Sequence, residues 1–233
     1  TREMDRLGGL QRRMPRTGTC FLLAAAAICG LPPLNGFVGE WLIYLSAYRG
    51  ATPGIAASNL GLGGFGVIAA LALIGGLAAL CFAKVYGVVF LGEPRSPEAA
   101  EARESAPSLW GPTATLAGGC LVLGLGGFLV LRLVAPVATG LHPSSLTAAD
   151  PTPLLQASRW LRDGTALMGA LLGAAGALTW GRRRLLRDRQ VAFGPTWGCG
   201  YNAPTPRMQY TGSSFAQPLT FAFRSLLRTE HHE

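Results

Sequence analysis

The sequence predicts an all-α integral membrane protein with about four transmembrane helices, the first of them discontinuous, and an irregular C-terminal tail. Of its 233 residues, 49% are hydrophobic and only 14% are charged, and the mean hydropathy is +0.33. Several apolar runs approach the ~20 residues that a helix needs to cross a bilayer, and each carries no charge or one. Alternating ten-residue strand patterns are absent, which argues against an outer-membrane barrel.

The first span, residues 17–48, contains the feature around which the chain is organised. Two apolar runs are joined there by the stretch LPPLNG at positions 31–36. As one helix the segment would be ~45 Å long, which exceeds a ~30 Å hydrocarbon core. Adjacent prolines also remove two backbone donors and clash with the preceding turn. We therefore expect two half-helices separated by a break that is formed by Pro32, Pro33, Asn35 and Gly36.

A carboxylate, Glu40, follows this break by about one turn. A charged carboxylate in a bilayer costs at least ~2.5–3.5 kcal/mol, so by default it marks a functional site. Broken helices with an acid nearby are typical of ion sites in transporters. Glu40 is therefore expected to load and release a proton in a partly hydrated site. The alternative is that the free amides of the break satisfy the carboxylate, which then only holds the kink.

Lys84 is the one charge of the second predicted span, residues 65–91, and lies on its inner half. A lysine in this position can relay protons. Its long apolar stem can instead carry the ammonium group out to the headgroups. The sequence leaves both interpretations open.

The remaining spans are expected at residues 112–134 and 163–181, which completes a membrane part, 1–189, followed by a tail, 190–233. Arginines cluster before the first span and after the fourth. Because positive flanks stay cytoplasmic, both the N-terminal flank and the tail are expected on the cytoplasmic side of a multi-pass protein. The tail is too broken for a span, but Pro218–Arg228 is expected to form a short amphipathic helix at the membrane surface or on a partner subunit.

Soluble and redox-active classes are not supported. The net charge of +8 is explained by arginine flanks around apolar spans, so nucleic-acid binding is not expected. None of the five cysteines forms a C-x-x-C motif, and no G-x-G-x-x-G follows a strand. We expect no catalytic, cofactor-binding or metal site in this chain. Because the sequence starts in a basic polar segment without a start methionine, we expect the C-terminal part of a longer membrane protein.

Two motifs resemble those of the proton-conducting membrane transporter family. GGLQRRMP at 8–15, followed by GLPPLNGFVGEW at 30–41, is similar to the antiporter-like subunits of respiratory complex I, the Mrp cation/proton antiporters and the membrane subunits of hydrogenase-4 and formate hydrogenlyase. The tail, TWGCGYNAPTPRMQYTGSSFAQP at 196–218, and KVYGVVFLG at 84–92 resemble the branch that holds hydrogenase-4 component B and formate hydrogenlyase subunit 3.

The resemblance implies a membrane core of inverted repeats, each with a discontinuous helix, of which residues 17–48 would be the second. Glu40 would lie at the exit end of a proton path. We expect Lys84 either to exchange protons or to tune the pKa of Glu40. Nickel–iron and iron–sulfur centres would lie in partner subunits that form a hydrophilic, hydrogenase-like arm on the bacterial inner membrane. The implied function is proton translocation coupled to electron transfer in that arm. The alternatives are an Mrp-type or complex I cation/proton antiporter subunit, moving H⁺ or Na⁺, and a structural membrane anchor without transport.

Overall fold

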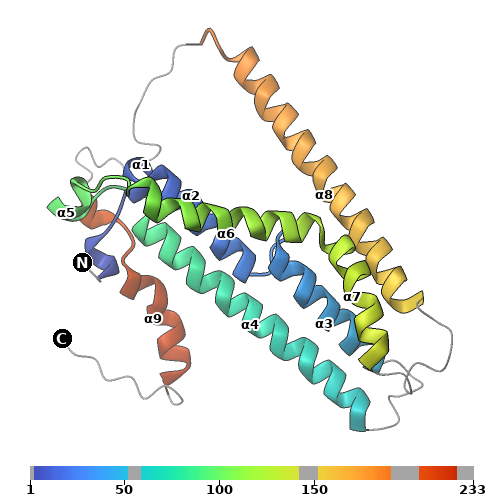
Figure 1. The fold of residues 1–233 in the computed structure, drawn as a ribbon. Helices are drawn as coiled ribbons and strands as arrows, with labels where there is room; N and C mark the ends of the chain where they lie inside the picture. Colours follow the sequence, from blue (N-terminus) through green and yellow to red (C-terminus); the bar gives the residue numbers. More distant parts are fainter. Residues whose placement is uncertain (1–2, 52–58, 142–151, 190–204, 225–233) are drawn as a thin grey trace. The chain divides into compact units, whose positions relative to one another are not determined.

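The computed structural model describes residues 3–51, 59–141, 152–189 and 205–224, which form helices and their connections and contain no strand (Figure 1). Three helices of this described part are long and apolar enough to cross a membrane, over Gly63–Val89, Pro107–Leu125 and Leu154–Leu185, and a shorter apolar helix covers Gly127–Val137. The predicted all-α membrane class is therefore confirmed. The helices, in chain order, are η1 (Met4–Arg6), α1 (Leu10–Arg13), α2 (Pro15–Ile28), α3 (Asn35–Ala51), α4 (Asn59–Val89), α5 (Pro97–Ala100), α6 (Pro107–Leu125), α7 (Gly127–Leu141), α8 (Thr152–Leu185), η2 (Pro206–Met208) and α9 (Gly212–Ala222).

The first span is discontinuous, as predicted. Helix α2 has 14 residues and ends at Ile28, and α3 has 17 residues and begins at Asn35. At 1.5 Å per residue the two pieces are about 21 and 26 Å long, so neither alone crosses a ~30 Å hydrocarbon core. The peptide bond between Pro32 and Pro33 is cis.

The third span differs from the prediction. Residues 112–134 are not one helix, because α6 ends at Leu125 and α7 begins at Gly127, and the chain bends between them (Figure 1). The bend falls on the Gly126-Gly127 pair, and glycine pairs are a common cause of sharp helix kinks. Pro112, taken as the start of the span, lies inside α6, which begins at Pro107.

Helix α8 is longer than predicted and begins at Thr152 rather than near residue 163. No proline or glycine interrupts residues 154–163, so the helix extends upstream of the apolar run. Its 34 residues span about 51 Å, which exceeds the hydrocarbon core. Part of the helix therefore extends beyond the apolar layer. Helix α4 likewise starts before the predicted residue 65, at Asn59.

The described chain falls into two compact units. The first comprises 1–25, 77–115 and 195–233, and the second comprises 26–76 and 116–194. The predicted division into a membrane part, 1–189, and a tail, 190–233, stays a prediction.

In the first unit the N-terminal flank is attached to the end of α4. The backbone N–H groups of Gly9 and Gln11 donate to the carbonyls of Leu91 and Phe90, at 2.9 and 2.8 Å. A small core of Leu10, Val89, Phe90 and Ala99 closes this junction, and Tyr86 stacks on Phe90 with ring centroids 5.3 Å apart. The Tyr86 hydroxyl donates to the Gln11 side chain, so its described role is structural.

The tail helix begins earlier than predicted. Helix α9 runs over Gly212–Ala222, whereas Pro218–Arg228 was expected, and residues 225–228 lie outside the described chain. Thr211 marks the start, because its Oγ1 accepts from the N–H of Ser214 while Ser214 Oγ accepts from the N–H of Thr211. This reciprocal cap precedes the helix by one residue.

In the second unit α7 packs along α8, and α3 packs against the first part of α8. Trp41 of α3 meets Trp160 of α8 edge-on, with ring centroids 6.5 Å apart, and the Arg49 guanidinium lies over the Trp160 ring. By contrast, large apolar side chains such as Leu116 and Leu178 are exposed by more than 70%. Exposed apolar helix faces of this kind suit contact with lipid or with another apolar surface.

Candidate functional site

The candidate site is the break between α2 and α3, and its first element is the way in which α2 ends. The N–H of Gly30 donates to the carbonyl of Ala27, and the N–H of Leu31 donates to the carbonyl of Ala26. This pair of bonds is a Schellman motif with Gly30 in the left-handed conformation, at φ +64°. The motif turns the chain out of the helix directly before Pro32, which cannot continue it.

The carboxylate of Glu40 lies against this turn. A Cβ built on Gly30 would stand 2.7 Å from Glu40 Cδ and 2.9 Å from Oε1, with Oε2 closer still. Side chains on a helix lean toward its N-terminus, so a residue in the second turn of α3 reaches back across the break. Glu40 is half-buried. The predicted association of Glu40 with the break is therefore present in the geometry.

Gly36 lets the two half-helices approach each other. A Cβ at this position would overlap the carbonyl oxygen of Ala27 in the last turn of α2. Asn35, the first residue of α3, is exposed, whereas Leu34 is only 4% exposed and anchors the connection.

The bend between α6 and α7 forms a wall beside the break. Gly124 packs against the Pro33 carbonyl oxygen and Leu34, where a Cβ would stand 2.6 Å from the Leu34 Cα. Gly127 packs against Val38, where a Cβ would stand 2.8 Å from the nearer methyl group. Protein therefore covers the unwound backbone on this side, as backbone at membrane depth requires.

No hydrogen bond or ion pair reaches the Glu40 carboxylate from the residues that the structure describes. The alternative in which the amides of the break satisfy the carboxylate therefore has no described bond to support it.

Lys84 belongs to the first unit, and its surroundings come from the tail. Its side chain is partly buried in an open pocket of about 580 Å³ between α4 and residues 209–210. The Lys84 Cε lies 3.5 Å from the point where a Cβ on Gly212 would stand. The start of α9 therefore lies beside the ammonium end of this side chain.

A set of long-range hydrogen bonds holds the tail in this place. The N–H of Glu93 donates to Gln209 Oε1 at 3.0 Å, and Gln209 Nε2 donates back to the carbonyl of Glu93 at 3.3 Å. Arg95 Nη2 donates to the carbonyl of Tyr210 at 2.7 Å, and the N–H of Gly212 donates to Asp5. The tail motif is thereby tied to the loop that follows α4.

Sequence reasoning missed several of these residues. The role of Gly30 could have been predicted from the sequence, because a glycine just after an apolar helix and before a proline commonly ends the helix. Gly124 and Gly127 were noted only as part of a glycine-rich run, and their partners are more than eighty residues away in the chain. Gln209 and Arg95 gave no local signal, since their hydrogen bonds join segments that are distant in sequence.

No cluster of three or more histidine, cysteine, aspartate or glutamate side chains that could hold a metal ion is found in the described residues. Cys20, Cys29, Cys81 and Cys120 form no disulfide. Cys199, which the sequence gave no metal partner, lies outside the described residues.

Known proteins match the chain as follows. Residues 1–65 match the family described as NADH:quinone oxidoreductase/Mrp antiporter, transmembrane region. Formate hydrogenlyase subunit 3 of Escherichia coli K12 is 35% identical over 229 residues, which is 97% of this chain and 35% of that protein. Hydrogenase-4 component B of the same organism is 33% identical over 98% of this chain and 34% of its own length. NADH-quinone oxidoreductase subunit N 1 of Symbiobacterium thermophilum is 32% identical over 57% of this chain and 24% of its own length.

These matches confirm the resemblance inferred from the two motifs and the tail, and they support a membrane location. The chain spans about a third of the length of the hydrogenase-type relatives that it matches.

We predict that Gly30→Ala destabilises the protein, whereas Gly39→Ala does not. An alanine at φ +64° costs about 1–2 kcal/mol, and its methyl group would also displace the Glu40 carboxylate. Gly39 lies within α3 and a Cβ there meets nothing within 4 Å, so alanine should be neutral or slightly stabilising. Thermal unfolding of the purified protein in detergent measures both. Equal melting temperatures for the two variants would contradict this account of the turn.

Proposed function

We propose, from this relationship to the NADH:quinone oxidoreductase/Mrp antiporter family, that the chain is part of a proton-translocating membrane subunit of a hydrogenase-4/formate hydrogenlyase-type respiratory complex. The observation that carries the proposal is the placement of Glu40. Its carboxylate lies against the unwound turn of a broken membrane helix and has no described hydrogen-bond partner. Such a site is chemically suited to binding one proton and passing it on.

In this proposal Glu40 cycles between a neutral and a charged form. The charged form is costly in a low-dielectric layer, so it needs water or a cation at the moment when the proton leaves. The break supplies a place for water, because the first-turn amides of α3 lack helical partners. The glycines at positions 30, 36 and 124 let the neighbouring backbone and the Glu40 carboxylate lie close to the break.

Lys84 is proposed as a second proton-exchanging group on the cytoplasmic side of the path. Its place beside the start of α9, in the pocket between α4 and residues 209–210, supports a defined setting for the ammonium group instead of free exposure to headgroups. A lysine carries a proton that it can exchange, whereas an arginine stays charged.

The proposal places the nickel–iron and iron–sulfur centres in partner subunits that form a hydrophilic arm, and it places the N-terminal flank and the tail on the cytoplasmic side of the inner membrane. The basic flanks of the first and last spans support this orientation. A second candidate is an Mrp-type or complex I antiporter subunit that moves H⁺ or Na⁺, and a third is a structural anchor. The hydrogenase-type assignment is favoured because that similarity extends through the tail, whereas the match to subunit N covers little more than half of the chain.

We predict that Glu40→Gln reduces proton translocation by at least about tenfold while the complex still assembles, because an amide cannot carry the proton. Proton uptake by reconstituted vesicles during electron transfer is the measurement. Glu98→Gln, which changes an exposed carboxylate in the short helix α5, is the matched control and should pump normally. A Glu40→Gln complex that pumps like the wild type would support the anchor alternative and would falsify the relay.

We predict that Lys84→Met and Lys84→Arg both slow proton translocation in the same vesicles. Methionine keeps the apolar stem without a charge, and arginine keeps the charge without a releasable proton. If Lys84→Arg behaves as the wild type while Lys84→Met does not, the residue supplies only a fixed positive charge and is not a relay.

We predict that the complex purified through the full-length protein contains large hydrophilic subunits that carry nickel and iron. Native mass spectrometry with metal analysis measures this. If only multi-span membrane subunits accompany the protein, the antiporter alternative replaces the hydrogenase-type assignment.

A further inference from the structure

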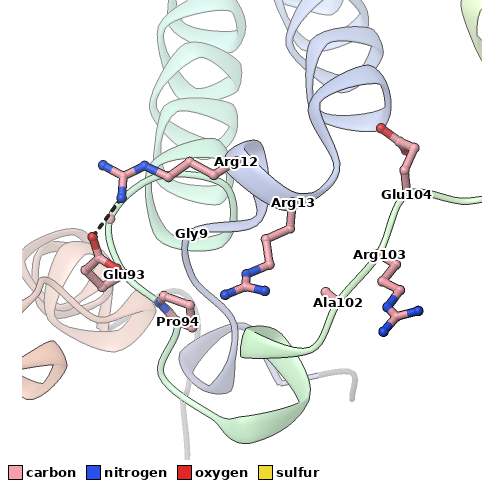
Figure 2. A pocket seen from close by; sticks show the side chains of 9 residues that line it. Gly9, Arg12, Arg13, Glu93, Pro94, Ala102, Arg103 and Glu104 are labelled. Carbon is pink, nitrogen blue, oxygen red and sulfur yellow. Dashed lines mark hydrogen bonds and ion pairs between the residues drawn. The ribbon is translucent and has the colours of Figure 1, made fainter.

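A basic pocket lies in the first unit, outside the membrane-spanning helices. Its volume is about 430 Å³, within the range of small-molecule sites. The N-terminal flank supplies one side, with Gly9, Arg12 and Arg13. The segment between α4 and α6 supplies the other, with Glu93 before α5 and Arg103 after it (Figure 2).

The close approach of the two sides of this pocket depends on the backbone conformation of Gly9. Gly9 has φ +64°, and a Cβ there would stand 3.0 Å from the Pro94 ring and 3.1 Å from the carbonyl oxygen of Gly92. The two segments can approach this closely only with glycine at this position. The backbone bond from Gly9 to Leu91 fixes their register.

Both acidic residues that line the pocket already have partners. Glu93 pairs with Arg12, with 3.0 Å between Oε1 and Nη1. Glu104 accepts from Thr17 Oγ1 at 2.6 Å and from the N–H of Arg16 at 2.7 Å, so its carboxylate caps the start of α2. The hydrogen bond from Thr17, with the backbone bonds, holds the pKa of Glu104 below its ordinary value, and the group is therefore ionised at neutral pH.

The guanidinium groups of Arg13 and Arg103 also line the pocket and are not paired with these acids. Arg13 points into the hollow between the Gly9–Pro94 side and Ala102, and Arg103 projects from the facing segment (Figure 2). Neither has a hydrogen-bond or ion-pair partner among the described residues. Both side chains are exposed, and exposed side chains change rotamer within nanoseconds. Donation of both guanidinium groups to one anion requires Arg103 to turn toward Arg13, because it projects away from that side chain in Figure 2. Planar guanidinium groups bind phosphate oxygens with two parallel hydrogen bonds.

The pocket lies beside the ends of three apolar helices. Its walls continue directly into three membrane helices of the unit, at the start of α2 (Pro15), the end of α4 (Val89) and the start of α6 (Pro107). Beside it the Arg16 guanidinium lies over the Trp110 ring, 4.8 Å from the centroid. Tryptophan and arginine at helix ends are typical of the headgroup layer.

We propose that this pocket binds the phosphate of an anionic phospholipid headgroup through Arg13 and Arg103. Basic pockets between membrane helices on the cytoplasmic side are known to take such headgroups. The pocket residues offer no aromatic face for a nucleobase, so the lining matches a phosphate and not a nucleotide. The inference goes beyond proton transport and does not depend on it.

The test is native mass spectrometry of the delipidated complex that contains the full-length protein, titrated with dioleoylphosphatidylglycerol and, separately, with dioleoylphosphatidylcholine. We expect one phosphatidylglycerol to bind the wild type at least about tenfold more tightly than the Arg13→Gln/Arg103→Gln variant, because each arginine near the surface contributes to the attraction. The matched control is Arg182→Gln/Arg183→Gln, which removes the same charge at the end of α8. Arg13→Lys/Arg103→Lys should bind with intermediate affinity.

If the control variant loses the lipid to the same degree, general charge explains the binding and the proposal is overturned. It is also overturned if the pocket variant binds the lipid normally, or if phosphatidylcholine binds as well as phosphatidylglycerol. Displacement of the lipid by millimolar inorganic phosphate would identify a free-phosphate site instead. Loss of a partner subunit from the pocket variant, with lipid binding intact, would identify a protein contact. Should the double variant fail to assemble, Arg103→Gln alone, in an exposed loop, makes the same test with a smaller effect.

Discussion

The constraint on which this structure depends is that an unwound backbone at membrane depth must be covered by protein or by trapped water. Pro32 and Pro33 force such a segment into the first span. The structure meets the constraint with very short backbone-to-backbone distances at glycines, because Gly36 lies on the carbonyl of Ala27 and Gly124 lies on that of Pro33. Close helix approach through small residues is how membrane proteins pack where the hydrophobic effect gives little driving force. The unwound segment of the first span is therefore covered by closely packed protein backbone.

The same packing decides what Glu40 can do. Because the Schellman turn at Gly30 leaves no side chain between the two half-helices, the carboxylate of α3 reaches the end of α2 directly. A larger residue at this position would separate the acid from the unwound backbone, where water can be held. Backbone geometry at a glycine thus positions a carboxylate that belongs to another helix, and the described structure gives that carboxylate no fixed partner.

Local signals in the sequence were enough to predict the class, the broken span and the association of Glu40 with it, since proline, glycine and charge act over a few residues. They were not enough for the bend at Gly126, which an apolar run with several glycines does not distinguish from a straight helix. The contacts of Gln209 with Glu93 and of Gly124 with Pro33 also escaped prediction, because they depend on segments that meet only in the folded chain. The observed helix bounds differ from the predicted ones where a polar stretch, such as residues 154–163, continues the helix without a proline or glycine.

The arginines of the N-terminal flank have different partners, which a count of charged residues does not distinguish. The positive-inside rule needs only their number, yet the structure gives neighbouring arginines different partners: Arg12 pairs with Glu93, Arg16 lies over Trp110, and Arg13 faces the pocket. Orientation in the membrane would survive an exchange of these positions, but the pocket would not keep the same lining, because Arg12 and Arg13 line it and Arg16 does not. A charge cluster that sets topology can therefore also contain a specific anion site, and only the partners of each side chain separate the two roles.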